Sequence, residues 1–332
     1  MGSGRLCRLI KAAVPEAEAI ENHTIMNQIY WNSYKRLEKE VLALSESIYI
    51  DDDQLKVYSP RICDLLVRTS IEIEALAKEL YFANSGTQPE DRDLYFDTDC
   101  LKLLEDKWSL NKKQILVVSP NFDFSKHENK VLQPLWNAAK RGKPQWKKAY
   151  QDVKHDRVNK LKQGKIEHLL KALGALYILN VYYRDSRFYT DTDYNASKID
   201  WGLGSEIFAV KVSKGEPRPS KKVPYEKKWD YEESVYLVKY TDDTILPLSE
   251  HIQLIEKETR QESANVVAQI LADKMKSGEL PTQEEDYNKM VDSLLAQNNY
   301  DSFKRVGEKH ATETVRIYNG LRFEAVLNKN QY

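Results

Sequence analysis

The sequence predicts an α+β protein that is mainly α, with an N-terminal helical bundle and a smaller C-terminal antiparallel sheet accompanied by helices. Two observations carry this prediction. Through most of residues 16–183, apolar residues recur at three- and four-residue steps, which is typical of helices that bury one face. After about residue 200 the pattern changes to β-rich runs. We therefore expect a helical bundle over 14–200 and an α+β region over 201–332.

The first region is expected to contain successive helices. Ser59 and Pro60 supply an N-cap hydroxyl and a first-turn proline, so they predict the start of a helix that continues over 62–81. Further helices are expected over 16–45, 100–108, 132–140, 146–157 and 166–183, with a short β-branched strand over 114–118.

The second region is expected to alternate between strands and helices. Residues 205–212 and 234–240 are β-rich runs, and helices are expected over 252–277 and 283–297. Residues 314–327 contain two more β-rich runs joined by Asn-Gly, the strongest short-range signal for a β-hairpin. The sequence therefore predicts a mostly antiparallel sheet that includes this hairpin.

The composition limits the class of function. The 332 residues contain 50 Lys and Arg against 51 Asp and Glu, so a nucleic-acid site must be a local basic patch. The three cysteines are scattered, which fits a reducing cytosol better than disulfides or a metal site. No apolar run has the length of a membrane span, and no glycine-rich phosphate loop occurs. We expect a cytoplasmic protein that uses no membrane, metal or cofactor.

The segment from Trp146 to Arg157 concentrates chemically capable side chains on one short helix. Its apolar residues have the spacing of a buried face, and His155 points away from that face, one or two turns along from Lys148 and Asp152. A neutral His155 can take a proton from a ribose 2′-hydroxyl, Lys148 can hold the phosphate, and Asp152 can orient the imidazole. An ordinary solvated helix end has the same residues, so both interpretations stay open.

This segment resembles bacterial members of the HEPN superfamily of helical-bundle proteins. The resemblance rests on residues 150–157 preceded by Trp146, on the leucine-rich helix over 169–176, and on residues 58–78, which are similar to the second helix of such bundles. It covers roughly residues 25–185. It implies an antiparallel bundle, frequent dimerisation, and often ribonuclease activity in phage defence or toxin–antitoxin systems.

One position departs from the family pattern. Active HEPN ribonucleases carry Arg, then four to six intervening residues, then His, and the only cation at the corresponding positions here is Lys148. Lysine lacks the planar bidentate guanidinium that suits phosphate. The sequence therefore predicts either a metal-independent endoribonuclease or RNA-binding protein, or an inactive HEPN-fold dimerisation or adaptor module. The expected partners are RNA, a second copy, or a cognate defence-system protein.

Two further sets of polar residues are candidates for the same function. On the helix over 62–81, Glu74 and Lys78 have the spacing of a surface ion pair, and Glu72 or Glu74 is expected to approach the His155 region if the bundle forms. Between the two β-rich runs, basic residues interleave with aromatics, which suits a nucleic-acid backbone but equally a solvated loop. The residues expected to bind RNA or phosphate are Lys154, Arg157, Lys221, Lys222, Lys227 and Lys228.

Overall fold

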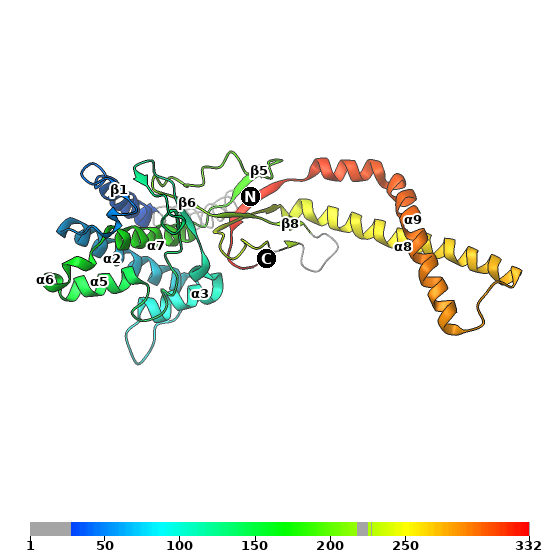
Figure 1. Cartoon of the computed structure of the whole chain (residues 1–332), viewed down its shortest axis with the longest axis horizontal. Coiled ribbons are helices and arrows are strands. Elements are labelled where there is room, and N and C mark those ends of the chain that lie inside the picture. Colours follow the sequence, from blue (N-terminus) through cyan, green and yellow to red (C-terminus); the bar gives the residue numbers. More distant parts are fainter. Residues whose placement is uncertain (1–27, 218–224, 227, 332) are drawn as a thin grey trace, which may run out of the picture.

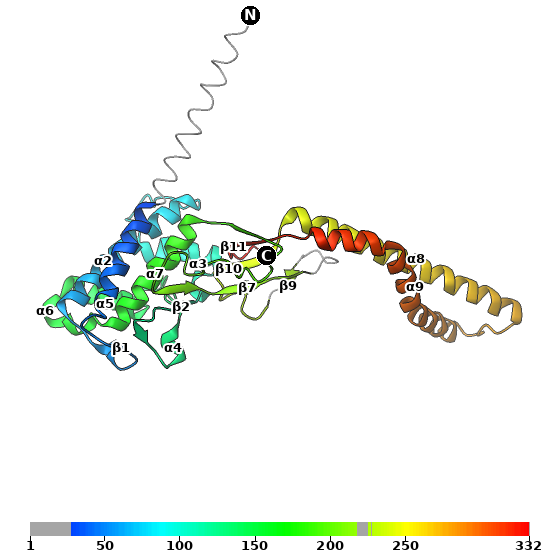
Figure 2. The same cartoon turned by 90° about the horizontal axis from the view of Figure 1, so that it is seen from above.

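The computed structural model describes residues 28–217, 225–226 and 228–331. It shows an α+β protein that is mainly α, as the sequence predicts. Figures 1 and 2 show a compact body of helices and short strands, from which two long helices project; they lie close together near the body and spread apart towards the tip. We call these two helices, residues 242–320, the arm.

Helices that pack around one buried helix form one side of the body. The central helix is α7 (Ile166–Arg184), which is buried along nearly its whole length. It contacts α2 (Pro60–Ala83) and α5 (Gln145–His155), which also contact each other. The Ser59 hydroxyl accepts a hydrogen bond from the Ile62 amide at 3.2 Å, so the predicted N-cap of α2 is confirmed. A further helix covers 28–42.

The connections between these helices are shorter and more irregular than the sequence suggests. The helix predicted over 132–140 is wrong, because β4 (Val131–Leu132) is followed there by turns. The helix predicted over 146–157 ends at His155, where Asp156 leaves the helical conformation. The remaining short helical elements are η1 (Gln54–Lys56), the π-helix η2 (Phe96–Leu101), α3 (Lys102–Trp108), η3 (Leu110–Lys112), α4 (His127–Lys130), α6 (Arg157–Lys160) and η4 (Leu161–Gln163).

Two small sheets cover the other side of the body. The larger sheet has the order β5–β11–β10–β7, in which β10 pairs parallel with β7 and the other neighbours are antiparallel. The smaller sheet has the order β4–β2–β6 and is antiparallel. The strands of these sheets, besides β4, are β2 (Ile115–Val117), β5 (Phe188–Asp191), β6 (Phe208–Val210), β7 (Val212–Lys214), β10 (Tyr236–Tyr240) and β11 (Phe323–Leu327). Two short pairs complete the set, β1 (Ile50–Asp51) with β3 (Phe122–Asp123) and β8 (Glu216–Pro217) with β9 (Tyr225–Glu226).

The hairpin predicted over 314–327 is wrong. Helix α9 (Glu284–Gly320) continues through the first β-rich run and ends at the Asn-Gly pair. The second run forms β11, which pairs with β10. In the sequence, the whole arm separates these two strands. Thr314 and Ile317, three residues apart, face α8 (Asp242–Ser277): Thr314 lies 2.8 Å from the His251 imidazole, and Ile317 packs against Ile245 and Leu248. This helical period therefore prevails over the β-propensity of the run.

One continuous core unites residues on both sides of position 200. Leu173 and Leu176 of α7 belong to the same buried cluster as Phe208 of β6, Tyr236 of β10 and Ala325 of β11. No arm residue within the described chain belongs to that cluster. The domain boundary at residue 200 stays a prediction, whereas the arm leaves the body between β10 and β11.

Candidate nucleic-acid interface

His155 is exposed at the C-terminal end of α5. Within the described chain its imidazole makes no hydrogen bond and no ion pair. Asp152 is half-buried and makes no side-chain hydrogen bond to His155. The imidazole is therefore accessible, but the structure does not give it the orienting carboxylate contact that the sequence suggests.

The two cations next to His155 have internal partners. Lys154 donates a hydrogen bond to the Tyr150 hydroxyl at 3.1 Å. Arg157 forms an ion pair at 2.7 Å with Asp64 of α2. Both members of that pair are about half exposed, so the pair contributes less than about 1 kcal/mol and can exchange its partner for a phosphate.

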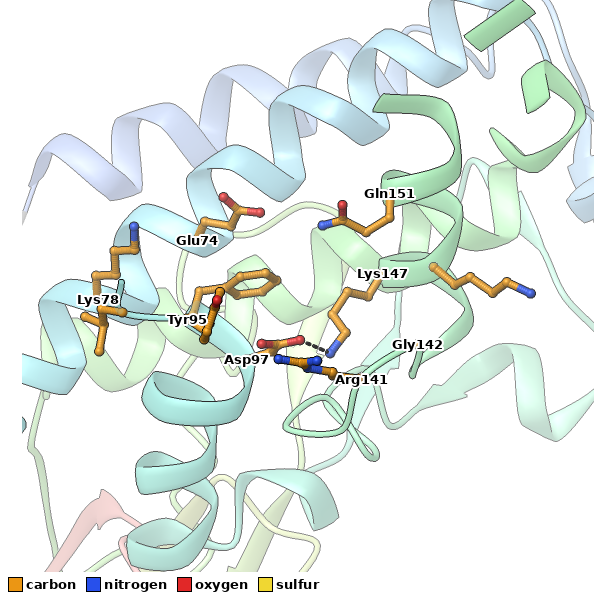
Figure 3. Close-up of a pocket in the computed structure, with 11 residues that line it drawn as sticks. Glu74, Lys78, Tyr95, Asp97, Arg141, Gly142, Lys147 and Gln151 are labelled. Atoms are coloured by element: carbon orange, nitrogen blue, oxygen red, sulfur yellow. Dashed lines mark hydrogen bonds and ion pairs between the residues drawn. The ribbon is translucent and has the colours of Figure 1, made fainter. Parts of the chain in front are cut away.

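A cavity of about 520 Å³ lies next to this helix face, between α2, η2, α5 and the turn at 141–142 (Figure 3). Lys148 and Gln151 of α5 line one wall, and Glu74 and Lys78 of α2 line another. The structure therefore brings Glu74 and Lys78 together with Lys148, which the sequence placed in two separate sets. His155 does not line this cavity.

A buried lysine shapes the floor of the cavity. The Lys147 ammonium donates to the Asp97 carboxylate at 2.9 Å and to the carbonyl oxygens of Ala138 and Lys140 at 2.7 Å each. Burial lowers the pKa of Lys147, and the Asp97 carboxylate opposes that shift. All three ammonium hydrogens are thus used, and they hold the turn that presents Arg141.

An aromatic ring stands beside this turn. Tyr95 is 45% exposed, and the Arg141 guanidinium lies over its ring at 5.7 Å from the centroid. Arg92 contacts the same ring at 5.3 Å, but it is also paired with Asp99 at 2.6 Å. Within the described chain Arg141 makes no ion pair, so its guanidinium is available to an anion.

The charge of the cavity is positive. Four cationic side chains and two carboxylates line it, a surplus of two positive charges. Lys147 and Asp97 neutralise each other at short range. The exposed cations that remain are Lys78, Arg141 and Lys148, which make no ion pair within the described chain. The arrangement can bind an anion beside a stacked ring.

The sequence gives no sign of three residues that line this cavity. The stripe formed by Trp146, Ala149, Tyr150 and Val153 is buried as predicted, but Lys147 is buried as well. Lysine next to Trp146 gives no signal of burial, because its partners come from segments that are distant or irregular. Tyr95 and Arg141 lie in loops without periodicity, so no pattern pointed to them.

The predicted basic insertion is only partly described. Lys221, Lys222 and Lys227 lie outside the described residues. Lys228 is half-buried. Beside it, Trp229 is 86% exposed and Lys211 lies over its ring at 5.3 Å.

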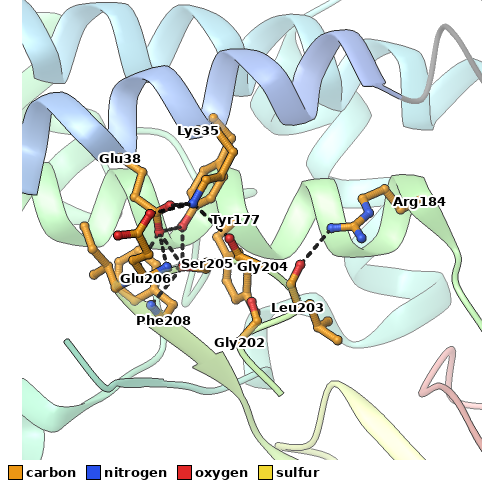
Figure 4. A network of polar contacts seen from close by, with 12 residues as sticks. Lys35, Glu38, Tyr177, Arg184, Gly202, Leu203, Gly204, Ser205, Glu206 and Phe208 are labelled. Carbon is orange, nitrogen blue, oxygen red and sulfur yellow. Dashed lines mark hydrogen bonds and ion pairs between the residues drawn. The ribbon is translucent and has the colours of Figure 1, made fainter. Parts of the chain in front are cut away.

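A second polar cluster has a structural role (Figure 4). Glu38, on the helix over 28–42, accepts hydrogen bonds from the hydroxyls of Tyr34 at 2.8 Å and Ser205 at 2.5 Å and from the Glu206 amide at 2.9 Å. Burial raises the pKa of Glu38, but hydrogen bonds from Lys35, Ser205 and Tyr34 outweigh burial and lower it overall. This saturated carboxylate ties the first helix to the loop before β6.

The comparisons with known proteins give no relative, since no family model, no curated protein and no solved structure matches this chain. None of the described helices combines the length and apolarity that crossing a bilayer requires.

Proposed function

We propose that this protein binds RNA, with one nucleotide of a single strand in the cavity between α2, η2 and α5. The observation that carries the proposal is the set of three exposed cations, Lys78, Arg141 and Lys148, around a half-exposed tyrosine ring. Phosphate is a natural ligand for such cations, and a base can stack on Tyr95.

The size and the polar walls of the cavity support a nucleotide. Its volume of about 520 Å³ lies within the range of about 300–1,000 Å³ that small ligands occupy. Glu74 and Gln151 lie across the cavity from each other (Figure 3). A carboxylate and an amide can accept and donate hydrogen bonds to the edge of a base.

The test compares two triple variants that change the net charge equally. Replacing Lys78, Arg141 and Lys148 by Gln removes the cavity cations, whereas replacing Lys160, Lys198 and Lys276 by Gln removes exposed cations elsewhere. We expect the cavity variant alone to weaken binding of a single-stranded RNA and to reduce the slope of log K against log salt by about 2. Equal loss in both variants would show that binding is non-specific and would contradict the proposal.

A stacking variant separates the base from the phosphate. Tyr95→Ala is expected to weaken binding by about 1–3 kcal/mol while leaving the salt slope unchanged, because stacking involves no counterion release. Tyr189→Ala, at an exposed tyrosine of β5 that does not line the cavity, is the matched control. Unchanged affinity in Tyr95→Ala would remove the base from the proposal and leave a phosphate site alone.

Cleavage of the bound RNA is the second proposed activity, and the accessibility of His155 favours it. His155 follows Lys148 by seven residues on α5, about 10 Å along the helix axis, so the strand beyond the cavity can reach the imidazole. The resemblance to HEPN proteins supports a role in phage defence or toxin–antitoxin systems. The Arg157–Asp64 pair next to His155 would then open to a phosphate.

His155→Ala tests cleavage separately from binding. We expect the variant to lose RNA cleavage and any cell toxicity while keeping its RNA affinity, with His127→Ala, an exposed histidine of α4, as the control. If the wild-type protein binds RNA but leaves it intact, the protein is a binding or adaptor module. Unchanged cleavage in His155→Ala would assign the chemistry to another residue.

A further inference from the structure

The arm buries few side chains for its length. Helix α9 has 37 residues, and its only buried residues are Ser302 and Val306. Where α8 crosses it, the buried side chains include Thr259 and Ser263, whose hydroxyls find no hydrogen-bond partner. In the described helices of the arm, the only buried apolar side chains are Ile245, Leu248 and Val267 of α8 and Val306 of α9. This is too little apolar surface to account for so long a hairpin.

One face of the arm exposes apolar side chains that a partner can bury. An apolar groove of about 560 Å³ lies between α8 and α9. Ile252 and Ile255 line it from α8, and Phe303, Val315 and Tyr318 line it from α9. The three α9 side chains are each more than half exposed. Figures 1 and 2 show that the arm stands clear of the body, so the body does not cover this face.

We propose that this groove is a dimer interface, in which the arm of a second copy packs antiparallel about a two-fold axis near Ala311. Such an axis places residues equally far before and after Ala311 opposite each other. Gly307, which has open space around it, then receives Val315 of the second copy. Phe303, eight residues before Ala311, then lies next to Tyr318 of the second copy, seven residues after it. The face thus supplies both the hollow and the side chains that fill it.

The available area is sufficient for a stable dimer. With the axis at Ala311, the two arms lie opposite each other only over residues 302–320 of α9, about 27 Å at 1.5 Å per residue. Two helices side by side are about 20 Å wide. The overlapping face therefore offers roughly 550 Å² per partner, about 1,100 Å² in total, which reaches the roughly 1,000 Å² expected of a specific interface. The product would be a four-helix arrangement.

Charge disfavours nucleic acid and anionic lipid as occupants and sets the orientation. Residues 242–320 contain 9 Lys and Arg against 15 Asp and Glu, a net charge of -6, which repels nucleic acid and anionic lipid. Much of the acidic surplus lies near the tip, where residues 279–292 carry five acidic residues and one lysine. A parallel dimer would bring the two tips together. An antiparallel dimer separates them.

The oligomeric state of the full chain tests the interface. We expect sedimentation to show a dimer in the wild-type protein, and Phe303→Asp to weaken it by about 30-fold or more, as loss of an interface anchor does. Tyr300→Asp, at an exposed residue of the same helix that does not line the groove, should leave the dimer intact. A monomeric wild-type protein, or a Phe303→Asp dimer of unchanged affinity, would overturn the proposal.

Disulfide trapping tests the axis without disturbing the groove. In a Cys7→Ser background, Ala311→Cys should form a homodimeric disulfide under mild oxidation, because only positions at the axis face themselves. The two described native cysteines are buried and should not interfere. Tyr318→Cys should not cross-link, since it faces the other end of the groove. Cross-linking at residue 318, or none at residue 311, would overturn the antiparallel arrangement.

Discussion

The body and the arm differ in the interactions that stabilise them. In the body, α7 is buried on all sides within one continuous core that reaches the strands of both sheets. In the arm, two helices of 36 and 37 residues bury few apolar side chains and carry many exposed ion pairs. The difference indicates that tertiary packing stabilises the body, whereas the arm relies on helix propensity and on surface that a partner can cover.

The two regions also differ in charge. The arm carries -6, and because the whole chain carries -1, the remainder carries +5. Four of these positive charges belong to Arg218, Lys221, Lys222 and Lys227, outside the described residues, so the described body is close to neutral. The proposed RNA cavity therefore depends on a local cluster of cations, whereas the arm as a whole is acidic. An overall charge near zero therefore conceals two regions suited to different partners.

The largest effect is expected at a buried ion pair of the body. Lys239 and Glu324 are almost fully buried and lie 2.8 Å apart. Lys239→Met leaves the Glu324 carboxylate buried with only Arg187 at 3.4 Å, so urea denaturation should show a loss of about 4 kcal/mol. Lys289→Met, which removes an exposed pair of the arm, should cost less than about 0.5 kcal/mol. Similar losses in both variants would contradict the contrast.

A core truncation should show the same contrast with apolar residues. Leu176→Ala, in the fully buried part of α7, is expected to lower the free energy of unfolding by about 3 kcal/mol, because it leaves a cavity. Leu254→Ala, at a residue of α8 that is 43% exposed, should change it by less than about 0.5 kcal/mol. Chemical denaturation of the two variants measures the difference. A cost above 2 kcal/mol at Leu254 would indicate that the arm face is already covered.

A smaller and pH-dependent effect is expected at Glu38. Its pKa is lowered in the folded protein, so its contribution is fully present above the unfolded value near 4.5 and is lost as the pH falls through the folded value. Glu38→Gln should lower the free energy of unfolding by about 2 kcal/mol at pH 7. Below about pH 4.5 the difference from the wild-type protein should become smaller.

The control for this variant is Glu206→Gln. Glu206 is 71% exposed and approaches Lys35 at 3.2 Å, so its replacement should have little effect at any pH. Thermal unfolding at pH 7 and at pH 3.5 measures both variants. If the difference in stability between Glu38→Gln and the wild-type protein does not depend on pH, the Glu38 carboxylate is not the group that titrates.

Removal of the arm should change stability least. Tyr240 and Phe323 are paired across β10 and β11, so a short turn can replace residues 242–320. We expect the free energy of unfolding of the body to change by less than about 1 kcal/mol, because the arm contributes nothing to the main core. The truncated protein should be monomeric and should bind RNA more tightly, since its net charge rises to +5. Collapse of the body in circular dichroism would contradict this division.

Periodicity predicted α2 and α7 closely, but it predicted only 252–277 of α8 and 283–297 of α9. It did not predict the partners of the strands. The buried stripe of α5 and the Ser59 cap of α2 depend on local spacing, and both are confirmed. The hairpin at Asn319 and Gly320 is wrong, because a turn signal cannot reveal that the preceding run packs against a helix 60 residues earlier. The parallel pairing of β10 with β7 likewise depends on segments that meet only in three dimensions.

The sequence determined the fold class and the helix faces, because hydrophobic spacing acts over a few residues. It also placed Lys148, Lys78 and Glu74 on exposed helix faces. Only the tertiary structure decided that these three side chains share one cavity with Tyr95 and Arg141, and that Lys147 is buried beneath them. It also set an acidic arm apart from the body. Such convergence depends on contacts between distant segments, which local patterns do not encode.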